Sequence, residues 1–440
     1  MLNNKYLRIL LLVGIAFSIS CQPLFARENV SLTGSKSVEW KEFLGVNAHF
    51  LWFTPEEYEQ QMFMLEKLGL NWVRVDLHWD RHEKTRNVYN LGMVDELVTN
   101  IQAHNLRSLF YLVGSAPFAS SAPAGVKNSD QYPPIHPKIF AERMGVLVSR
   151  YPMVDAWQIW NEQNTPAFWQ PKEDPIAYGK LFEESVKEIR SIDPNKQIVM
   201  GGMAYYSQMP HRGGLMLEAL QQLGAFSLGT AIAYHPYSLE PEGDEPEKAD
   251  FVLRAKAVNE HLRKGGASQI WATEWGWSSY SGEVEEQALI GEAGQADYLL
   301  RRLALMSVLD YDRIFMFALS DLDSRATLRD QSYGLLDLNG NEKPVYTALS
   351  HFLDFTGPEL SPAEPVEFLF DKKGLVSITW SQEDNKLWMF WAQENGLAKI
   401  RCTEPATLLN PLTGETASLD CTNGIVEVEV IKSLQLLKFN

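Results

Sequence analysis

The sequence predicts an α/β protein, a (β/α)8 TIM barrel followed by a small antiparallel β-sandwich. Between residues 43 and 356, short runs rich in β-forming residues alternate eight times with segments of helical periodicity. After Gly357 only short β-rich segments follow. A chain of 440 residues can hold both units, because a barrel of this kind uses about 250 residues. A doubly wound open sheet is the alternative, but it normally has fewer strand-helix units.

The barrel strands are expected in eight short apolar segments. These are residues 44–49, 72–76, 108–113, 156–160, 198–201, 230–234, 270–273 and 314–318. The helices between them carry their own signals. Thr54-Pro-Glu-Glu57 predicts a capping box with proline in the first turn, in a helix that ends at Gly69. Residues 289–309 form the longest helical pattern, and residues 344–355 predict the eighth helix.

The C-terminal part is predicted to form its own domain. A proline-rich linker begins at Gly357, and strands are expected at 375–380, 387–392, 425–430 and 434–439. We therefore expect a barrel domain over residues 40–357 and a sandwich domain over residues 363–440.

The N-terminal residues 1–26 are expected to be an export signal. Basic residues precede an apolar run over residues 9–19, and this run is shorter than the about 20 residues that a membrane span needs. Ser18-Ile-Ser-Cys21 resembles a lipobox, with Ser18 in place of the usual leucine, and Leu24-Phe-Ala26 resembles a cleavage site. Both remain open, so we expect a periplasmic, lipid-anchored or secreted protein whose membrane contact is limited to a lipid at Cys21 or an uncleaved signal.

Cysteine content bears on disulfide formation, and net charge limits the classes of binding partner. Cys402 and Cys421 form an even pair that an oxidising exported compartment would allow to close as a disulfide, and two separate buried thiols are the alternative. The net charge of −17 argues against nucleic acid as a partner and disfavours a polyanionic substrate. We expect a monomer without a cofactor, acting on a polysaccharide or oligosaccharide.

Two glutamates at the ends of apolar runs are the strongest functional signal. The segments are Trp157-Gln-Ile-Trp-Asn-Glu162 and Ile270-Trp-Ala-Thr-Glu274. In a parallel barrel the C-terminal ends of all strands lie on one face, so Glu162 and Glu274 are expected to converge from the fourth and seventh strands. A glycosidase needs such a pair of carboxyl groups. The other Asn-Glu dipeptides, Asn259-Glu260 and Asn341-Glu342, are expected on a solvated helix face and in a turn.

The same face is expected to collect further side chains. Arg74 and Asp76 follow from the second strand, and His235 and Tyr237 from the sixth. His49, from the first strand, is a candidate for the sugar site, with a buried histidine under the rim as the alternative. Aromatic rings near strand ends are candidates for stacking on sugar faces, although each could instead fill the core. They are Trp52, Trp79, Trp169, Tyr205, Tyr206, Trp275, Trp277 and Tyr280.

These motifs resemble the retaining glycosidases of clan A, most closely glycoside hydrolase family 39. The resemblance rests on Trp160-Asn161-Glu162, on Thr273-Glu274-Trp275-Gly276, on Arg74 in Trp-Val-Arg-Val-Asp and on His235-Pro-Tyr237, and it covers residues 40–440. Within that family, the segment Phe-Leu-Gly-Val-Asn-Ala-His that begins at Phe43 is similar to endo-acting enzymes of exopolysaccharide pathways.

The resemblance implies a role for each carboxyl group. Glu162 would be the general acid/base and Glu274 the nucleophile, with carboxyl groups about 5 to 5.5 Å apart. Arg74 would keep Glu274 ionised, because a nearby cation lowers a carboxyl pKa by about 1 to 3 units. Asn161 would lie near the sugar 2-hydroxyl.

Other supporting residues follow from the same resemblance. His235 and Tyr237 would orient the nucleophile. Apart from the resemblance, Trp169, Trp275 and Trp277 are taken as substrate-binding residues because rings near strand ends can stack on sugar faces. One departure concerns the eighth strand, where many clan members have a tryptophan and this chain has Phe315-Met-Phe-Ala-Leu-Ser-Asp321.

Competing site types have weaker signals. His78 and His82 are four residues apart and next to Glu83, but no further ligand motif supports a metal, so loop histidines lining a cleft are the favoured interpretation. No Gly-x-Ser-x-Gly nucleophile elbow and no phosphate-binding glycine loop occur.

The predicted activity is a retaining β-glycosidase that hydrolyses a polysaccharide, endo-acting in exopolysaccharide synthesis or turnover. The alternatives are an exo-acting β-xylosidase-type enzyme, a transglycosylase and a non-catalytic carbohydrate-binding protein. The presence of both glutamates and Arg74 argues against the last of these.

Overall fold

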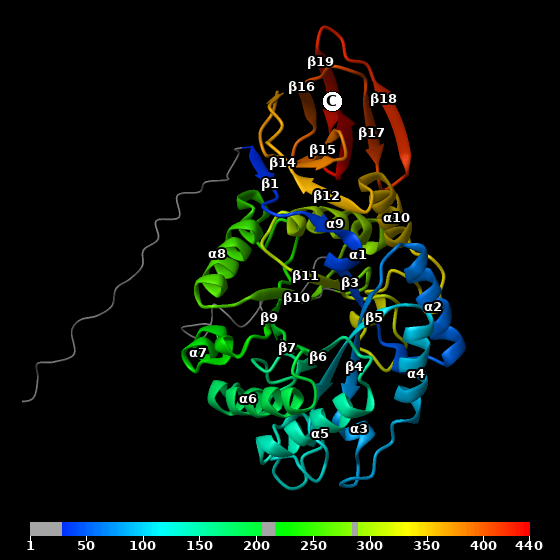
Figure 1. The fold of residues 1–440 in the computed structure, drawn as a ribbon. Coiled ribbons are helices and arrows are strands. Elements are labelled where there is room, and N and C mark those ends of the chain that lie inside the picture. Colours follow the sequence, from blue (N-terminus) through cyan, green and yellow to red (C-terminus); the bar gives the residue numbers. More distant parts are fainter. Residues whose placement is uncertain (1–28, 205–215, 284–288) are drawn as a thin grey trace, which may run out of the picture.

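The computed structural model describes residues 29–204, 216–283 and 289–440. Figure 1 shows one layer of helices around a barrel and a group of C-terminal strands packed against it. The expected export signal over residues 1–26, with Cys21, lies outside the described residues, as do Tyr205 and Tyr206. In the part of the chain that is described, no helix combines the length and apolar character that crossing a bilayer requires.

Eight parallel strands form the closed barrel. Neighbours pair in the order β3, β4, β5, β6, β7, β9, β10 and β11, and β11 pairs again with β3. Their bounds are β3 Leu44–Asn47, β4 Trp72–His78, β5 Arg107–Val113, β6 Ala156–Ile159, β7 Gln197–Met200, β9 Ala231–His235, β10 Gln269–Trp275 and β11 Arg313–Met316. A further short strand, β8 (Met203–Ala204), pairs with β9. The predicted barrel is confirmed, and each expected strand segment overlaps one of the eight.

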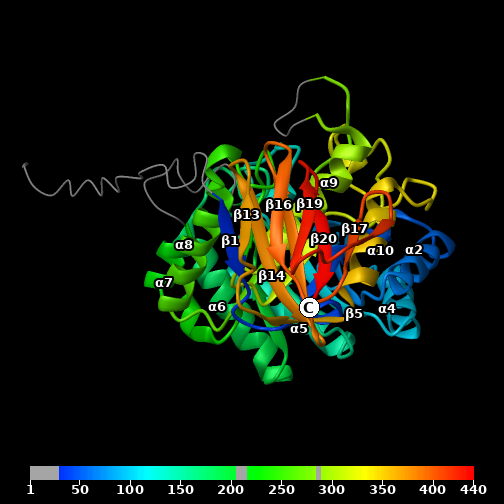
Figure 2. The same cartoon turned by 90° about the horizontal axis from the view of Figure 1, so that it is seen from above.

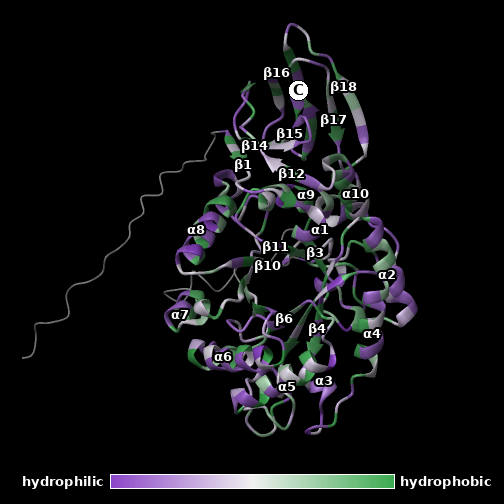
Figure 3. Ribbon diagram, in the orientation of Figure 1, coloured by the Kyte–Doolittle hydropathy of each residue, from purple (hydrophilic) through white to green (hydrophobic). Residues whose placement is uncertain are grey.

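The outer layer consists of helices, of which α1 precedes the first barrel strand and the others follow barrel strands. They are α1 Trp40–Phe43, α2 Pro55–Lys67, α3 Trp79–His82, α4 Gly92–Ala103, α5 Pro137–Arg150, α6 Pro175–Ile192, α7 Met216–Gln222, α8 Asp250–Lys264, α9 Gly291–Ser307 and α10 Pro344–Thr356. Short 3₁₀ turns lie at Phe50–Trp52, Ser129–Gln131, Ala225–Leu228, Pro246–Lys248 and Asp330–Ser332. In Figure 3 hydrophilic and hydrophobic residues alternate along the outer helices, as expected for helices that pack one face on a barrel.

The start of α2 shows how local sequence sets an element. The Thr54 hydroxyl accepts a hydrogen bond from the backbone N–H of Glu57, and the Glu57 carboxylate accepts one from the backbone N–H of Thr54. This is the predicted capping box, which satisfies donors that a helix N-terminus otherwise leaves free. Gly69 follows the helix with a φ of 71°, a conformation that favours glycine.

Large apolar side chains fill the barrel interior. Trp72, Trp271 and Phe315 pack edge to face or tilted, with ring centroids 6.0 to 6.3 Å apart. Small residues such as Ala156 and Ala231 lie in the same buried cluster and leave room for these rings. The barrel is thus a packed core, and its functional groups lie at the strand ends.

The C-terminal strands form two packed sheets. The larger sheet has the order β18, β17, β20, β15, β14, β12 and β2, with β1 paired to β14, and the smaller has the order β13, β16 and β19. Their bounds are β1 Val30–Thr33, β2 Val38–Glu39, β12 Glu359–Pro362, β13 Phe368–Phe370, β14 Leu375–Gln382, β15 Asn385–Ala392, β16 Gly396–Arg401, β17 Ala406–Asn410, β18 Glu415–Leu419, β19 Ile425–Val430 and β20 Gln435–Phe439. Trp388 and Phe390 stack at 4.0 Å in the core shared by the two sheets.

Two features of this region were not predicted. The N-terminal strand β1 pairs in parallel with β14, and β2 pairs with β12, so the start of the described chain completes the C-terminal sheet. Strands β12, β13, β16, β17 and β18 were also missed. Cys402 and Cys421 are joined by a disulfide that closes a separation of 19 residues.

The larger sheet contacts the barrel through a polar cluster. The Trp391 indole N–H on β15 donates to Glu242 Oε1 at 2.8 Å, and Arg301 on α9 donates to the same oxygen at 2.6 Å. Seen from above in Figure 2, the C-terminal strands lie across the barrel and its helices. This contact ties the loop that follows β9 to the C-terminal sheet.

Candidate active site

A cavity of about 500 Å³ lies at the C-terminal ends of the barrel strands. It is lined by His49, Trp52, Asp76, His78, Tyr111, Asn161, Glu162, Thr165, Ala167, Phe168, Ala204, Tyr237, Glu274, Phe317, Arg329, Asp330 and Tyr333. Both candidate glutamates therefore face one space, although they are separated by more than a hundred positions in the sequence.

The backbone around Glu162 has an uncommon conformation. After β6 ends at Ile159, Trp160 has a φ of 76° and Glu162 a φ of 43°, values that non-glycine residues seldom adopt. The surrounding structure fixes them. The Trp160 N–H donates to the carbonyl of Leu112 at 3.0 Å, and the Glu162 N–H donates to that of Gly202 at 2.9 Å. The loop thereby aims the Glu162 side chain into the cavity.

Arg74 holds the other carboxyl group. Its Nη1 donates to Glu274 Oε1 at 2.6 Å and to Asn47 Oδ1 at 2.7 Å, and its Nη2 donates to Asn161 Oδ1 at 2.7 Å. Its Nε donates to Gln158 Oε1 at 2.7 Å. These partners come from three barrel strands or their ends, β3, β6 and β10, so one fully buried guanidinium sets the position of the nucleophile candidate and its neighbours.

Glu274 is held in its charged form. Burial raises the pKa of this carboxyl group, but the charges of His235 and Arg74 and the Arg74 hydrogen bond oppose burial and leave the pKa below its ordinary value. Tyr237 donates its hydroxyl to Glu274 Oε2 at 3.3 Å. Burial and the Glu274 charge raise the pKa of Tyr237 well above its usual range, so the phenol keeps the proton that it donates.

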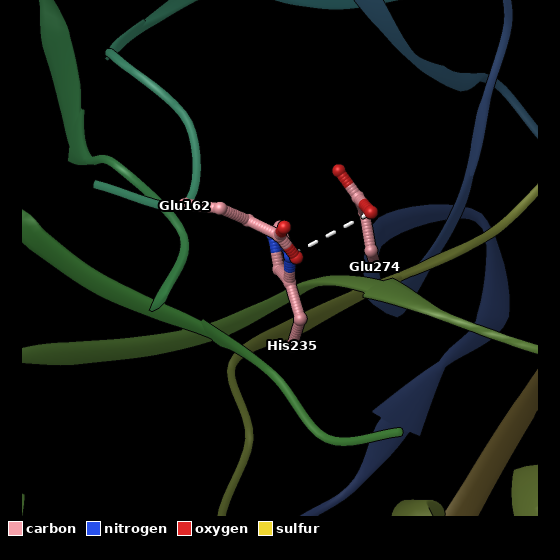
Figure 4. Close-up of side chains that lie close together, drawn as sticks. All are labelled: Glu162, His235 and Glu274. Atoms are coloured by element: carbon pink, nitrogen blue, oxygen red, sulfur yellow. Dashed lines mark hydrogen bonds and ion pairs between the residues drawn. The ribbon is translucent and has the colours of Figure 1, made fainter. Parts of the chain in front are cut away.

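His235 lies between the two carboxyl groups. Its Nδ1 is 2.8 Å from Glu162 Oε1 and 3.6 Å from Glu274 Oε2, and Figure 4 shows the three side chains close together. Its Nε2 is 3.0 Å from Thr273 Oγ1, which fixes the ring. An oxygen of Glu162 and an oxygen of Glu274 lie within 4.8 Å of each other. This bound on one oxygen–oxygen distance lies nearer to the carboxyl separation of a retaining pair, about 5 to 5.5 Å, than to the about 6.5 to 9.5 Å of an inverting pair.

Asn161 is oriented by the same network. Because Arg74 occupies its amide oxygen, the amide nitrogen is the group that Asn161 offers to the cavity. His49 also lines the cavity, and its ring packs edge to face on Phe317 at 5.3 Å.

Trp169, Trp275 and Trp277 do not line the cavity, and their prediction as substrate-binding residues is wrong. They are exposed by 1 %, 0 % and 1 % respectively and belong to the packed core. The Trp277 indole N–H donates to the backbone carbonyls of Ser238 and Leu239, so this ring supports the loop that carries Tyr237. A tryptophan next to a catalytic motif can equally well be a structural support.

Other aromatic rings face the cavity instead. Phe317, at the end of the eighth strand, takes the place where a tryptophan was expected from the clan, and it packs on Tyr333 at 5.2 Å. Tyr333, Arg329 and Asp330 come from the loop between β11 and α10 and were missed. The available signal was that these polar and aromatic residues lie in the long loop between the eighth strand and the last barrel helix.

The possibility of a metal was also considered. In the described part of the chain, one cluster has donor atoms close enough to bind an ion, and it consists of Glu162, His235 and Glu274. Arg74 already supplies a cation to Glu274, which fits an acid/base pair better than a metal site. His78 lines the cavity, whereas His82 does not and its Nδ1 lies 3.1 Å from the carbonyl of Asn90. These two histidines therefore do not form a shared ligand pair.

Comparison with known proteins identifies a family to which the sequence is similar. The family model described as Cellulase (glycosyl hydrolase family 5) matches residues 31–300. No curated protein sequence matches the chain.

Solved structures share the fold. A family 39 glycoside hydrolase from Bacteroides cellulosilyticus WH2 is 18% identical with a TM-score of 0.69, over 92% of this chain and 82% of that one. A monomeric β-xylosidase from Caulobacter crescentus CB15 is 14% identical with a TM-score of 0.63, over 93% and 99%. A family 30 endoxylanase from Clostridium papyrosolvens C71 is 11% identical with a TM-score of 0.60, over 94% and 99%.

At these identities the likeness is one of fold. The predicted clan is confirmed, although the family model that matches is that of family 5 and not of family 39. The chain belongs to the cellulase family, glycosyl hydrolase family 5, and is a retaining glycoside hydrolase.

Proposed function

We propose that Glu274 is the nucleophile and Glu162 the general acid/base of a β-glycosidase. The observation that carries this proposal is the pair of carboxyl oxygens within 4.8 Å, of which Glu274 alone is bound by a buried guanidinium. A retaining glycosidase needs this asymmetry, because one carboxyl group must attack while the other donates a proton.

The reaction has two steps. A Glu274 oxygen attacks the anomeric carbon, the glycosidic bond breaks, and Glu162 gives its proton to the leaving oxygen, which yields a glycosyl ester on Glu274. Water then attacks the same carbon and transfers a proton to Glu162, and the ester bond breaks to release Glu274 as a carboxylate. Arg74 and Tyr237 supply positive charge and a hydrogen bond to that carboxylate before and after the ester exists.

The substrate is proposed to be a polysaccharide that is cleaved internally. The cavity carries aromatic rings on several walls, among them Trp52, Phe168, Phe317 and Tyr333, and such rings suit the apolar faces of sugars. The resemblance of the segment starting at Phe43 to the endoglycosidase of the Psl exopolysaccharide pathway supports a role in exopolysaccharide synthesis or turnover. Export, with a lipid at Cys21 or cleavage after Ala26, and a monomeric state belong to the same proposal.

An exo-acting β-xylosidase is the second candidate. It is favoured by the fold shared with the β-xylosidase from Caulobacter crescentus CB15. We also propose that the chain is related to glycoside hydrolase family 39. A transglycosylase is a further alternative, and it would use the same two glutamates.

The test is a screen of xylo-, cello- and manno-oligosaccharides and of purified exopolysaccharides, with mass analysis of the products. Internal cleavage gives a distribution of oligosaccharides at early times, whereas exo action releases one sugar at a time. Proton NMR of the first product reports the anomer, and the retained β-anomer is expected. Products that appear only with an added sugar acceptor would replace hydrolysis by transglycosylation. An α-anomer as first product would contradict the assigned roles.

A further inference from the structure

An arginine outside the active-site cavity holds the loop that carries Tyr237. This loop, which we call the Tyr237 loop, comprises residues 236–242 and follows β9. Arg302, on α9, is fully buried and does not line the cavity. Its guanidinium donates hydrogen bonds to four oxygen atoms of the loop. They are the carbonyl oxygens of Pro236 at 2.7 Å, Pro241 at 2.8 Å and Glu240 at 3.1 Å, and the hydroxyl oxygen of Ser238.

The carbonyl of Pro236 is the acceptor closest to the reacting groups along the chain. It belongs to the peptide unit that joins Pro236 to Tyr237, and the N–H of this unit donates to the carbonyl of His235 at 2.9 Å. A peptide unit is planar, so the two hydrogen bonds fix the plane at its oxygen and at its nitrogen. Because the Cα of Tyr237 lies in the same plane, Arg302 fixes the point from which the phenol reaches Glu274 Oε2 at 3.3 Å.

The Arg302 guanidinium is itself held by two aromatic rings. Its central carbon lies 3.5 Å from the centre of the Phe251 ring and 5.0 Å from that of the Trp277 ring. Such contacts attract a guanidinium to the ring faces and limit its movement. The Trp277 indole N–H also donates to the carbonyls of Ser238 and Leu239 in the Tyr237 loop. The loop is therefore attached to a fixed group and not to a mobile side chain.

The end of the Tyr237 loop that faces the C-terminal sheet adjoins a second cavity, of about 450 Å³. Glu242 and Trp391 are among the residues that line it. Because close packing is absent on that side, the conformation of the loop depends on its hydrogen bonds. Glu242, at the end of the loop, is held separately by Arg301 and Trp391. Removal of Arg302 would therefore release the part of the loop near Tyr237 and leave the other end attached.

We propose that Arg302 is a positioning residue of the reaction, which acts through Tyr237 and sets the hydrogen bond from the phenol to Glu274. That hydrogen bond is 3.3 Å long, so a shift of the phenol by about 0.5 Å away from Glu274 would take it out of hydrogen-bond range. Arg302 thus affects the carboxylate that attacks the sugar without contacting the substrate. The inference rests on the proposed function, because it takes Glu274 as the nucleophile.

The test is a double-mutant cycle between Arg302 and Tyr237. Arg302→Met keeps a long side chain against the Phe251 and Trp277 rings and removes the hydrogen bonds to the loop. We would measure kcat and KM for the wild type, Arg302→Met, Tyr237→Phe and the double variant, on the substrate with the highest wild-type kcat/KM. Arg302→Met is expected to lower kcat about 3- to 10-fold and to change KM less than about 2-fold. In the Tyr237→Phe background the same substitution is expected to change kcat less than about 2-fold, because the hydrogen bond that it disturbs is already absent.

Arg263→Met is the matched control. Arg263, on α8, donates to the carboxylates of Asp310 and Asp312. These aspartates directly precede β11, at the end of the barrel opposite to the active-site cavity. The control is expected to lower the midpoint of thermal unfolding, measured by circular dichroism, and to leave kcat within about 1.5-fold of the wild type. An equal loss of kcat in Arg263→Met and Arg302→Met would reduce the effect to general stability and overturn the inference.

A conservative variant grades the effect. Arg302→Lys keeps a positive charge and three N–H donors but lacks the planar fork that reaches four oxygen atoms of the loop. Its kcat is expected to lie between those of the wild type and Arg302→Met. A kcat below that of Arg302→Met would contradict a role through these hydrogen bonds.

Other results would overturn the inference and leave the proposed function intact. A loss of kcat by the same factor with and without the Tyr237 hydroxyl would show that Arg302 does not act through it. An unchanged kcat, or a raised KM at unchanged kcat, would do the same. If Arg302→Met does not fold, Ser238→Ala answers the question, because it removes one acceptor of Arg302 and keeps the guanidinium. Its expected loss of kcat is about 2- to 3-fold, and this loss should disappear in Tyr237→Phe.

Failure of the proposed function gives a different pattern. A wild type that is inactive on every β-glycoside and polysaccharide, or a fully active Glu274→Gln, would overturn the proposed function and this inference with it. Additive losses in an active wild type would overturn the inference alone.

Discussion

The two glutamates of the active site have different surroundings. Glu274 is 10% exposed and is bound by Arg74 and Tyr237, whereas Glu162 is 19% exposed and has His235 as its near side-chain partner. Glu274 lies near the end of strand β10, where the pairing register with β11 shifts, and Glu162 lies on a loop where its own φ is positive. The same residue type thus serves one role where charge is stabilised and another where a proton can be exchanged, and environment decides which.

The largest effect is expected from removing the nucleophile. Glu274→Gln should lower kcat by at least about 10,000-fold on every substrate, because no glycosyl ester can form on an amide. The measurement is the initial rate on the polysaccharide and on an aryl glycoside, with circular dichroism to confirm the fold. Full activity of this variant on natural substrate would end the assignment of the pair.

Removing the acid/base should discriminate between substrates. Glu162→Gln is expected to lower kcat about 100- to 10,000-fold when the leaving group is a sugar, and far less when it is 4-nitrophenol, which leaves without a proton. The variant lacks the base that activates water for attack on the glycosyl ester. Azide attacks this ester without help from a base, so added azide should restore part of the rate. The β-glycosyl azide product is detected by mass spectrometry. An equal loss of kcat on both kinds of leaving group would contradict the assignment of Glu162 as the general acid/base.

Arg74 can be used to weaken the asymmetry itself. Arg74→Gln removes the cation beside Glu274 and is expected to lower kcat/KM about 100- to 1,000-fold. Because Arg74 lowers the pKa of Glu274, the acidic limb of the kcat/KM profile should move to higher pH by about 1 to 3 units. Arg74→Lys keeps the charge without the planar fork, so its limb should move less although its rate is also reduced. A limb that stays in place in Arg74→Gln would mean that Glu274 does not set it.

The smallest effect is expected at Tyr237. Tyr237→Phe removes one hydrogen bond of 3.3 Å to Glu274 and should lower kcat about 5- to 10-fold with little change in KM. Tyr346→Phe is the control, because its hydroxyl donates to the carbonyl of Met64 away from the cavity. Equal losses in the two variants would point to general loss of stability.

Most of the barrel could be predicted because its signals are periodic. Each of the eight strands follows from a short apolar run between helical segments, and the closed sheet then brings Glu162 and Glu274 together without further information. The order of strands in a parallel barrel is fixed by topology, so sequence position is enough to place a strand-end residue on the face.

The buried tryptophans, part of the cavity wall and the pairing of β1 with β14 could not be predicted, because they depend on tertiary contacts that no local sequence pattern encodes. Trp275 and Trp277 lie within three residues of Glu274, yet side-chain packing places both in the core, and a tryptophan at such a position could equally have faced a sugar. The cavity residues Arg329 and Tyr333 come from a loop whose path is set by tertiary contacts. The pairing of β1 with β14 joins residues more than three hundred positions apart, and no local signal reports such a partner.

That pairing also bears on how the chain reaches its native state. Val30 and its neighbours are made before the barrel, and their partner strand is made only after the whole barrel has been synthesised. The C-terminal sheet therefore cannot be completed during synthesis of the barrel, and β1 stays without its partner strand until β14 has been made. A chain that stopped before β14 would therefore lack the strand with which β1 pairs.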